Sequence, residues 1–186
     1  MFVNFSMYKL LPILLFAVGF SLTTKDIYDN SYALIIGINE YENVQPLNYA
    51  VDDAFLIADF LINSFDFPEN NVSLLINEDA TRQNILKSLY DINNKAQDND
   101  RILIYFSGHG ETMDLPAGGQ IGYLIPVDGE IEDLYLSSID MSELRKISNM
   151  TEAKHLLYLV DACYGGIAAV GARGFNSKTT PNYIEK

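Results

Sequence analysis

The segment Arg101-Ile-Leu-Ile-Tyr-Phe-Ser-Gly-His-Gly110 decides the fold of this chain. Five consecutive apolar residues follow Arg101, a pattern typical of a strand that is buried on both faces of a sheet. Ser107 and His109 come directly afterwards, with a glycine on each side of the histidine. The segment therefore predicts a buried strand over residues 101–106 that ends at a histidine-containing turn.

A second segment repeats this arrangement further along the chain. The apolar run Leu156–Val160 is followed directly by Asp161-Ala-Cys-Tyr-Gly-Gly166. Sites in parallel sheets lie at the carboxyl ends of the strands, which is where both polar segments fall. Other apolar runs predict strands over residues 32–38 and 72–76, a hairpin around residues 122–127, and helices over residues 50–65, after Thr81, and over residues 138–148. The alternation predicts an α/β fold in three α/β/α layers around a mostly parallel sheet.

Composition limits the classes of partner. The chain has 186 residues, enough for one domain with a hydrophobic core, and 48% of them are hydrophobic. The formal net charge of -13 disfavours binding to nucleic acid or to anionic lipid headgroups and favours basic substrates. Neither a P-loop motif nor a dinucleotide-binding glycine motif follows a predicted strand. A nucleotide-binding α/β domain is therefore a weak alternative.

The N-terminal residues have the pattern of a signal peptide. Residues 10–22 form an apolar run of 13 residues, shorter than the ~20 that a membrane span needs. Small residues near its end permit cleavage after Ser21, so we expect the mature protein to be secreted or extracytoplasmic, without a stable membrane span. An uncleaved anchor and a buried N-terminal helix are the alternatives. The predicted divisions are a signal peptide (1–21), a linker (22–31), the folded domain (32–175) and a polar tail (176–186).

Cys163 and His109 together have the chemistry of acyl transfer. Cys163 is the single cysteine, which excludes an intramolecular disulfide and a CxxC metal motif. A thiolate is the nucleophile in such chemistry, and a nearby imidazole makes it available and later protonates the leaving amine. Backbone amides in the glycine-rich segments, those of Gly110 and Cys163, are predicted to bind the oxyanion. The second histidine, His155, lies at a strand start and is interpreted as structural.

Each of these residues alone has a plainer interpretation. A single cysteine is more often a small buried hydrophobe than a nucleophile. A single histidine in a glycine turn is likewise more often without a catalytic role. Their joint occurrence at two strand ends is what favours catalysis.

The two segments resemble the catalytic signatures of the caspase clan, Tyr105-Phe-Ser-Gly-His-Gly110 and Asp161-Ala-Cys-Tyr-Gly165. His109 precedes Cys163 by 54 residues, close to the ~50 typical of caspases. The resemblance covers roughly residues 32–175 and includes Gly37, Asn39, Leu47–Ala54, Ile125–Asp128 and Asp140–Leu144. It implies a caspase-like fold with a p20-type catalytic domain and the activity of a cysteine endopeptidase.

Within this clan, the sequence is most similar to metacaspases and bacterial caspase-like proteins. Caspases that cut after aspartate have glutamine two residues before the nucleophile, whereas this chain has Asp161. The resemblance pairs Asp161 with Asp53, and together they imply an acidic pocket for a substrate Arg or Lys. The alternatives are that Asp53 is a solvated carboxylate at a helix start and that Asp161 caps local backbone amides.

Two departures from the family pattern lead to further expectations. The family has two more strands after the cysteine segment, and this chain stops 23 residues after Cys163, so we expect the sheet to lack its last strands. A p10-like C-terminal portion is then an expected partner, and a catalytically inactive or partner-dependent binding module is the alternative function. Asp128 matches a calcium-binding position of metacaspases, but Met141 and Ser142 stand where acidic residues are usual. We therefore expect no cofactor and no metal site, with calcium dependence doubtful.

Overall fold

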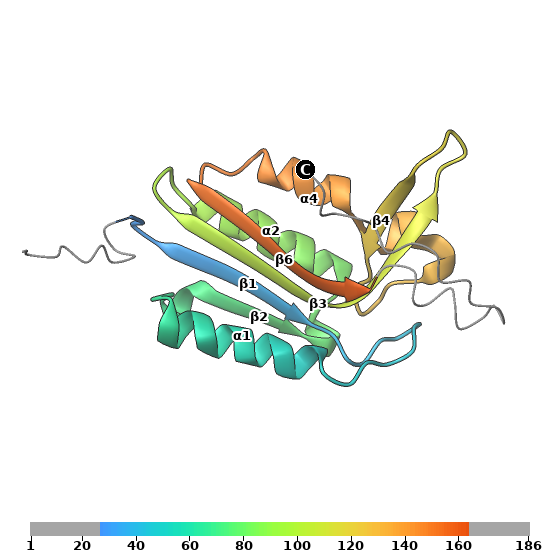
Figure 1. The fold of residues 1–186 in the computed structure, drawn as a ribbon, viewed down its shortest axis with the longest axis horizontal. Coiled ribbons are helices and arrows are strands. Elements are labelled where there is room, and N and C mark those ends of the chain that lie inside the picture. The colour runs from blue at the N-terminus through green and yellow to red at the C-terminus, as the bar shows by residue number, and fades with distance from the viewer. Residues whose placement is uncertain (1–26, 164–186) are drawn as a thin grey trace, which may run out of the picture.

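A six-stranded sheet runs through residues 27–163, the part of the chain that the computed structural model describes (Figure 1). Four strands are parallel and lie in the order β2 (Val72–Ile76), β1 (Ser31–Gly37), β3 (Arg101–Asp114) and β6 (His155–Cys163). The far half of β3 pairs antiparallel with β4 (Gln120–Leu124), which pairs with β5 (Ile139–Asp140). Helix α1 (Ala50–Ser64) covers one face, and α2 (Arg82–Lys95) and α4 (Met141–Ser148) cover the other. The predicted three-layer α/β/α fold is confirmed.

Short helices complete the connections between these elements: η2 (Glu69–Asn71), η3 (Asn77–Asp79), η4 (Ile131–Asp133) and α3 (Leu134–Ser137). Several local predictions are confirmed to within a residue or two. β2 has the predicted bounds, and β1 lies one residue earlier than expected. Thr81 is the N-cap of α2, because its side-chain oxygen accepts a hydrogen bond from the backbone N–H of Asn84 at 3.2 Å.

Two strands are longer than the sequence indicated. The prediction that the strand beginning at Arg101 ends before the Gly-His-Gly turn is wrong, because β3 continues to Asp114. The continuation is stabilised by pairing with β4 across a turn in which Gly118 and Gly119 have φ of 92° and 94°, a region that favours glycine. β6 likewise extends beyond Val160 to Cys163, in register with β3. Both candidate catalytic residues therefore lie within strands rather than in turns.

The helix predicted over residues 138–148 begins later than expected. Residues 139–140 form β5, and α4 begins at Met141. Asp140 is its N-cap, and its carboxylate accepts hydrogen bonds from the N–H groups of Ser142 and Glu143. The difference arises because Ile139 and Asp140 pair with Leu124 and Tyr123 of β4, which takes them out of the helix.

Two separate apolar clusters hold the layers together. On the α2 and α4 face, Leu34, Ile36, Ile104 and Phe106 pack against Ile85, Leu89 and Leu144. On the α1 face, Ala33, Ile35 and Tyr105 pack against Ala54, Ala58 and Leu61. Gly37 allows the N-terminal end of α1 to approach β1, since a Cβ there would lie 2.6 Å from the carbonyl oxygen of Ala50.

The expected signal peptide (1–21), residues 22–26 of the linker, residues 164–175 of the predicted domain and the polar tail (176–186) lie outside the described residues. Ser31, at the end of the predicted linker, already belongs to β1. Among the helices of residues 27–163, none is both long enough and apolar enough to cross a membrane.

Candidate active site

The candidate site lies where the parallel part of the sheet ends. In the register of the strands, Ser107 lies between Gly37 of β1 and Asp161 of β6. Two residues further along β3, His109 is the register partner of Cys163. Neighbouring strands are about 4.8 Å apart, so the backbones of His109 and Cys163 run side by side.

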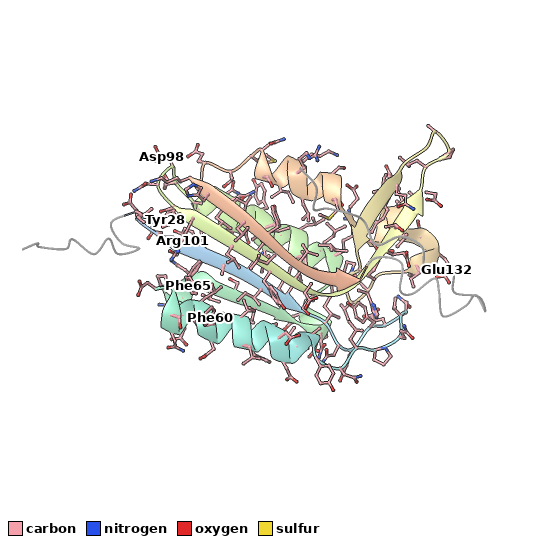
Figure 2. All side chains as sticks on the ribbon, viewed as in Figure 1. Tyr28, Phe60, Phe65, Asp98, Arg101 and Glu132 are labelled. Atoms are coloured by element: carbon pink, nitrogen blue, oxygen red, sulfur yellow. The ribbon has the colours of Figure 1, made fainter. Side chains whose placement is uncertain are left out.

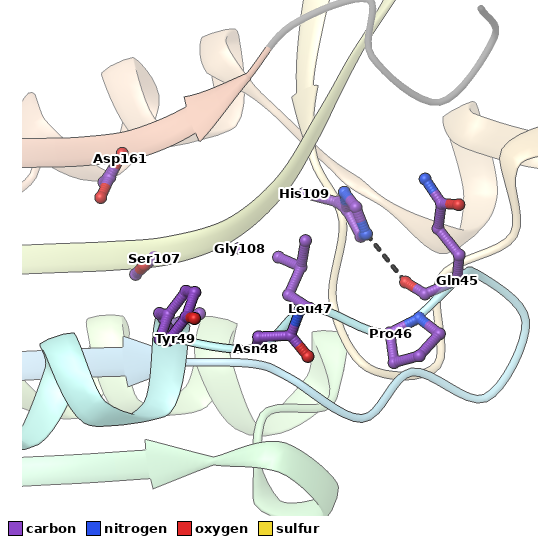
Figure 3. Close-up of a pocket in the computed structure, with 10 residues that line it drawn as sticks. Gln45, Pro46, Leu47, Asn48, Tyr49, Ser107, Gly108, His109 and Asp161 are labelled. Atoms are coloured by element: carbon purple, nitrogen blue, oxygen red, sulfur yellow. Dashed lines mark hydrogen bonds between the residues drawn. The ribbon is translucent and has the colours of Figure 1, made fainter. Parts of the chain in front are cut away.

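The imidazole of His109 is held in one orientation. Its Nε2 atom lies 2.9 Å from the backbone carbonyl oxygen of Gln45 (Figure 3). A carbonyl oxygen accepts hydrogen bonds and cannot donate them, so Nε2 carries the hydrogen. In the neutral ring, Nδ1 is then the nitrogen with a free lone pair. The side chain as a whole is buried, with 7% of His109 exposed.

Tyr41 contacts His109 from a second side. The Tyr41 hydroxyl accepts a hydrogen bond from the backbone N–H of His109 at 2.8 Å. The two rings also pack together, with their centroids 4.9 Å apart at an angle of 48°. Burial raises the pKa of the Tyr41 hydroxyl far above its usual value, so it is a neutral group near the imidazole.

The loop between β1 and α1 carries both Tyr41 and Gln45. At its start, the side-chain oxygen of Asn77 accepts hydrogen bonds from the N–H groups of Asn39 and Glu40, at 2.9 and 3.1 Å. Further along, the N–H of Glu42 donates to the carbonyl of Val127 at 3.0 Å, and that of Leu47 donates to Asn39 at 2.8 Å. The loop is therefore fixed on both sides of the two residues that contact His109.

A cleft of about 380 Å³ opens beside the histidine. It is lined by residues 45–50 and by Ser107, Gly108, His109 and Asp161 (Figure 3). Asp161 is exposed, and Ser107 is buried in the neighbouring strand. A substrate side chain that entered this cleft would meet a carboxylate, two strand backbones and the imidazole.

Asp53 and Asp161, the two carboxylates predicted to form the pocket, both affect the pKa of the buried Tyr105 hydroxyl. Tyr105, Ser107 and His109 lie at alternate positions of β3 and share a face. The pKa of Tyr105 is raised, first by burial and further by the negative charges of Asp161 and Asp53, although a hydrogen bond with Ser107 lowers it. Asp53 lies half-buried in the first turn of α1, and it is not among the residues that line the cleft.

Sequence reasoning did not find Tyr41, Gln45 or Tyr105 as site residues. Gln45 acts through its backbone carbonyl, which any residue would supply, so its identity carries no signal. Tyr105 lies within a predicted buried strand and Tyr41 lies just after another, so neither position stands out as a site residue. Gly110 lies in β3 opposite Leu124, and His155 lies at the start of β6, where its Nδ1 is 2.9 Å from the hydroxyl of Tyr28.

Around Asp128, the position that the resemblance relates to calcium, the structure places Arg82. Asp128 accepts a hydrogen bond from the backbone N–H of Arg82 at 2.9 Å. The Arg82 guanidinium binds both carboxylate oxygens of Glu143, at 2.8 and 3.0 Å. Within residues 27–163, no group of three or more His, Cys, Asp or Glu side chains is arranged to hold a metal ion. Asp128 and Glu143 are thus both engaged by Arg82, and neither Met141 nor Ser142 supplies a carboxylate.

Comparison with known proteins agrees with the caspase-like fold expected from the sequence. Residues 30–183 match the Caspase domain family, so the chain belongs to that family. It is 31% identical to Metacaspase-1 of Eremothecium gossypii over 149 residues, which are 75% of this chain and 32% of that protein. It is 30% identical to Metacaspase-1 of Plasmodium falciparum over 148 residues, 72% of this chain and 24% of that protein. The chain thus spans about a third or less of the length of these curated relatives.

A solved structure supports the fold independently. A protein from Geobacter sulfurreducens superimposes with a TM-score of 0.60 at 19% sequence identity. The match covers 75% of this chain and 53% of that one. At this level of identity, the likeness concerns the fold alone.

Proposed function

We propose that the chain is the catalytic portion of a cysteine endopeptidase in which Cys163 is the nucleophile and His109 the acid/base. One observation carries this proposal. His109 is the register partner of Cys163, and the hydrogen bond from Nε2 to Gln45 leaves Nδ1 as the basic nitrogen. A base with its second nitrogen fixed by another group is the arrangement that activates a nucleophile.

In the proposed reaction, the thiol proton of Cys163 moves to Nδ1 of His109. The thiolate attacks the carbonyl carbon of the scissile peptide bond, and backbone N–H groups of Gly110 and Cys163 stabilise the oxyanion. The C–N bond then breaks, and Nδ1 returns the proton to the leaving amine. Water attacks the remaining thioester with His109 as the base, which releases the acid and regenerates the thiol. Throughout these steps, the Gln45 carbonyl stabilises the imidazolium form through Nε2.

The proposed substrates have Arg or Lys before the scissile bond. Asp161 lines the cleft two residues before Cys163, and β6 remains extended over both positions. Its carboxylate would form a charge-assisted hydrogen bond with a basic side chain, whereas an acidic side chain would meet like charge. Asp53 supports the same preference from α1, because its charge acts on the Tyr105 phenol together with that of Asp161.

A p10-like C-terminal portion is the proposed partner. Among the described strands, none pairs with the outer edge of β6. Beside that edge, an apolar groove of about 400 Å³ is lined by side chains from α1, β3 and β6, among them Phe60, Phe65, Leu103, Leu157 and Leu159. Figure 2 shows Phe60, Phe65, Arg101 and Tyr28 near the end of the sheet at which the parallel strands start. Further strands would form hydrogen bonds with the unpaired backbone groups at the edge of β6, and a helix would fill the groove.

Calcium is not required in this proposal. The Arg82 guanidinium already neutralises Glu143, and Asp128 is engaged by the Arg82 backbone. Turnover is therefore expected to be the same with a calcium chelator as with added calcium. Strict dependence of turnover on calcium would contradict this part.

The decisive experiment uses a peptide with a thiol-reactive group placed after Arg. The parent chain, alone or with a metacaspase p10 portion, should be labelled at Cys163, while Cys163→Ala should not be labelled and should lose all turnover. His109→Ala should lower the rate by at least about 100-fold, because acid/base catalysis typically contributes 10²–10⁴-fold. Wild-type turnover by Cys163→Ala would refute the assignment. Absence of labelling and turnover under both conditions would instead favour a binding module.

A further inference from the structure

The contacts of Tyr41 point to a role beyond packing. Two residues of one loop meet His109 at different atoms: Gln45 at the ring nitrogen and Tyr41 at the backbone N–H. Only three residues separate them, so movement of one displaces the other. The Tyr41 ring also lies against the imidazole, which restricts rotation of the His109 side chain.

Gly108 shows how closely Tyr41 is fitted. A Cβ at Gly108 would lie 2.5 Å from the Tyr41 hydroxyl oxygen, which is closer than any stable contact. The glycine before the histidine therefore makes room for the tyrosine hydroxyl. This accounts for one glycine of the Gly-His-Gly segment by a contact within the protein rather than with substrate.

We propose that Tyr41 is a positioning residue for catalysis: its hydroxyl and ring fix His109 and the Gln45 carbonyl relative to each other, so that the Nε2–H form persists and Nδ1 remains the basic nitrogen. This inference rests on the proposed function of His109. The competing explanation is that Tyr41 only fills space, since it packs against two apolar clusters. Tyr41→Phe separates the two, because it keeps the ring and removes only the hydroxyl.

The first measurement does not depend on turnover. The chain has only two histidines, so ¹⁵N-histidine spectra report the tautomer of each imidazole ring separately. His155 contacts Tyr28 and serves as the internal reference. In the parent chain at a pH where the ring is neutral, His109 should show the Nε2–H form. In Tyr41→Phe, we expect a mixture of tautomers at His109 and an unchanged signal at His155.

The second measurement is kinetic. Because small displacements of catalytic groups have large effects on rate, Tyr41→Phe should lower kcat by about 10–100-fold with KM within about twofold. Tyr90→Phe is the matched control, since Tyr90 is exposed on α2, and it should leave both values unchanged. An unchanged tautomer and kcat in Tyr41→Phe would overturn the inference. A parent chain that shows the Nε2–H tautomer but no turnover, either alone or with a metacaspase p10 portion, would instead count against the proposed function and leave only the effect of Tyr41 on the His109 tautomer.

Discussion

The two faces of the sheet are covered to different extents. On one face, α2 and α4 pack over β1, β3 and β6, and the cluster includes side chains of all three strands. On the other face, α1 packs over β2, β1 and β3, and it leaves Leu157 and Leu159 of β6 exposed. The polar cleft lies at one end of this half-covered face, and the apolar groove lies along it.

The closed face therefore mainly stabilises the fold, and the half-covered face carries the candidate site. The apolar cluster on the closed face contributes burial, the main favourable term in folding. The half-covered face presents Tyr105, Ser107 and His109 from alternate positions of β3. Because residues of a strand alternate between faces, one strand can serve both purposes without compromise.

The largest expected effect tests this separation with a matched pair of substitutions. Leu34→Ala on the closed face, where Leu34 is fully buried, should lower the free energy of unfolding by about 3–5 kcal/mol. Leu157→Ala on the other face, where 51% of the side chain is exposed, should cost less than about 1 kcal/mol. Urea denaturation of both variants measures the difference. Equal losses would mean that the β6 side chains are already covered in the folded chain.

A smaller effect is expected at the cleft. Asp161→Asn should lower kcat/KM on an Arg substrate by about 10–100-fold, equivalent to ~1.4–2.7 kcal/mol, because a charge-assisted hydrogen bond is replaced by a neutral one. Asp53→Asn should have a weaker effect, since Asp53 does not line the cleft. Stability should change little in either variant.

The measurement for this prediction is a profile of cleavage on peptides randomised before the scissile bond. Preference for Arg and Lys should weaken in Asp161→Asn. Cleavage by the parent after Asp or Glu would contradict the acidic-pocket assignment. An unchanged profile in Asp161→Asn would show that the carboxylate has only a structural role.

The sequence predicts those features that depend on local signals. The cap at Thr81, the bounds of β2 and the amphipathic pattern of α1 follow from residue type and spacing within a few positions. The extension of β3 does not, because Gly-His-Gly is typical of a turn and only pairing with β4 makes it a strand. Tertiary pairing overrides local preference there.

The residues of the candidate site also fall into those that the sequence predicts and those that it does not. The sequence predicts His109 and Cys163 as a pair because few residue types supply such chemistry, and the register of β3 and β6 places their backbones opposite each other. The support around His109 was not identifiable. Gln45 contributes a carbonyl oxygen, which every residue has. The hydroxyl of Tyr41 reaches the backbone N–H of His109 only after the loop between β1 and α1 has folded against β3.

The smallest expected effect concerns the start of α4 on the closed face. The Asp140 carboxylate accepts hydrogen bonds from the N–H groups of Ser142 and Glu143, at 2.6 and 2.9 Å. Glu143 returns a hydrogen bond to the N–H of Asp140, which completes a capping box. Asp140→Ala should therefore lower the free energy of unfolding by about 1 kcal/mol at pH 7, and Asp140→Asn by less, because asparagine also caps helices well.

The pH dependence makes this last prediction specific. Burial alone would raise the pKa of Asp140, but the hydrogen bonds from Ser142 and Glu143 and the charge of Lys146 outweigh it and lower the pKa. A carboxyl whose pKa is lower in the folded state stabilises the fold above its unfolded pKa of about 3.9, and that contribution is lost as the pH falls through the folded value. The difference between the parent and Asp140→Ala should thus be full at pH 7 and shrink below about pH 4, as followed by urea denaturation at each pH. A difference that stays constant down to about pH 2 would show that the cap does not depend on the charge of Asp140, and that the protonated side chain caps α4 equally well.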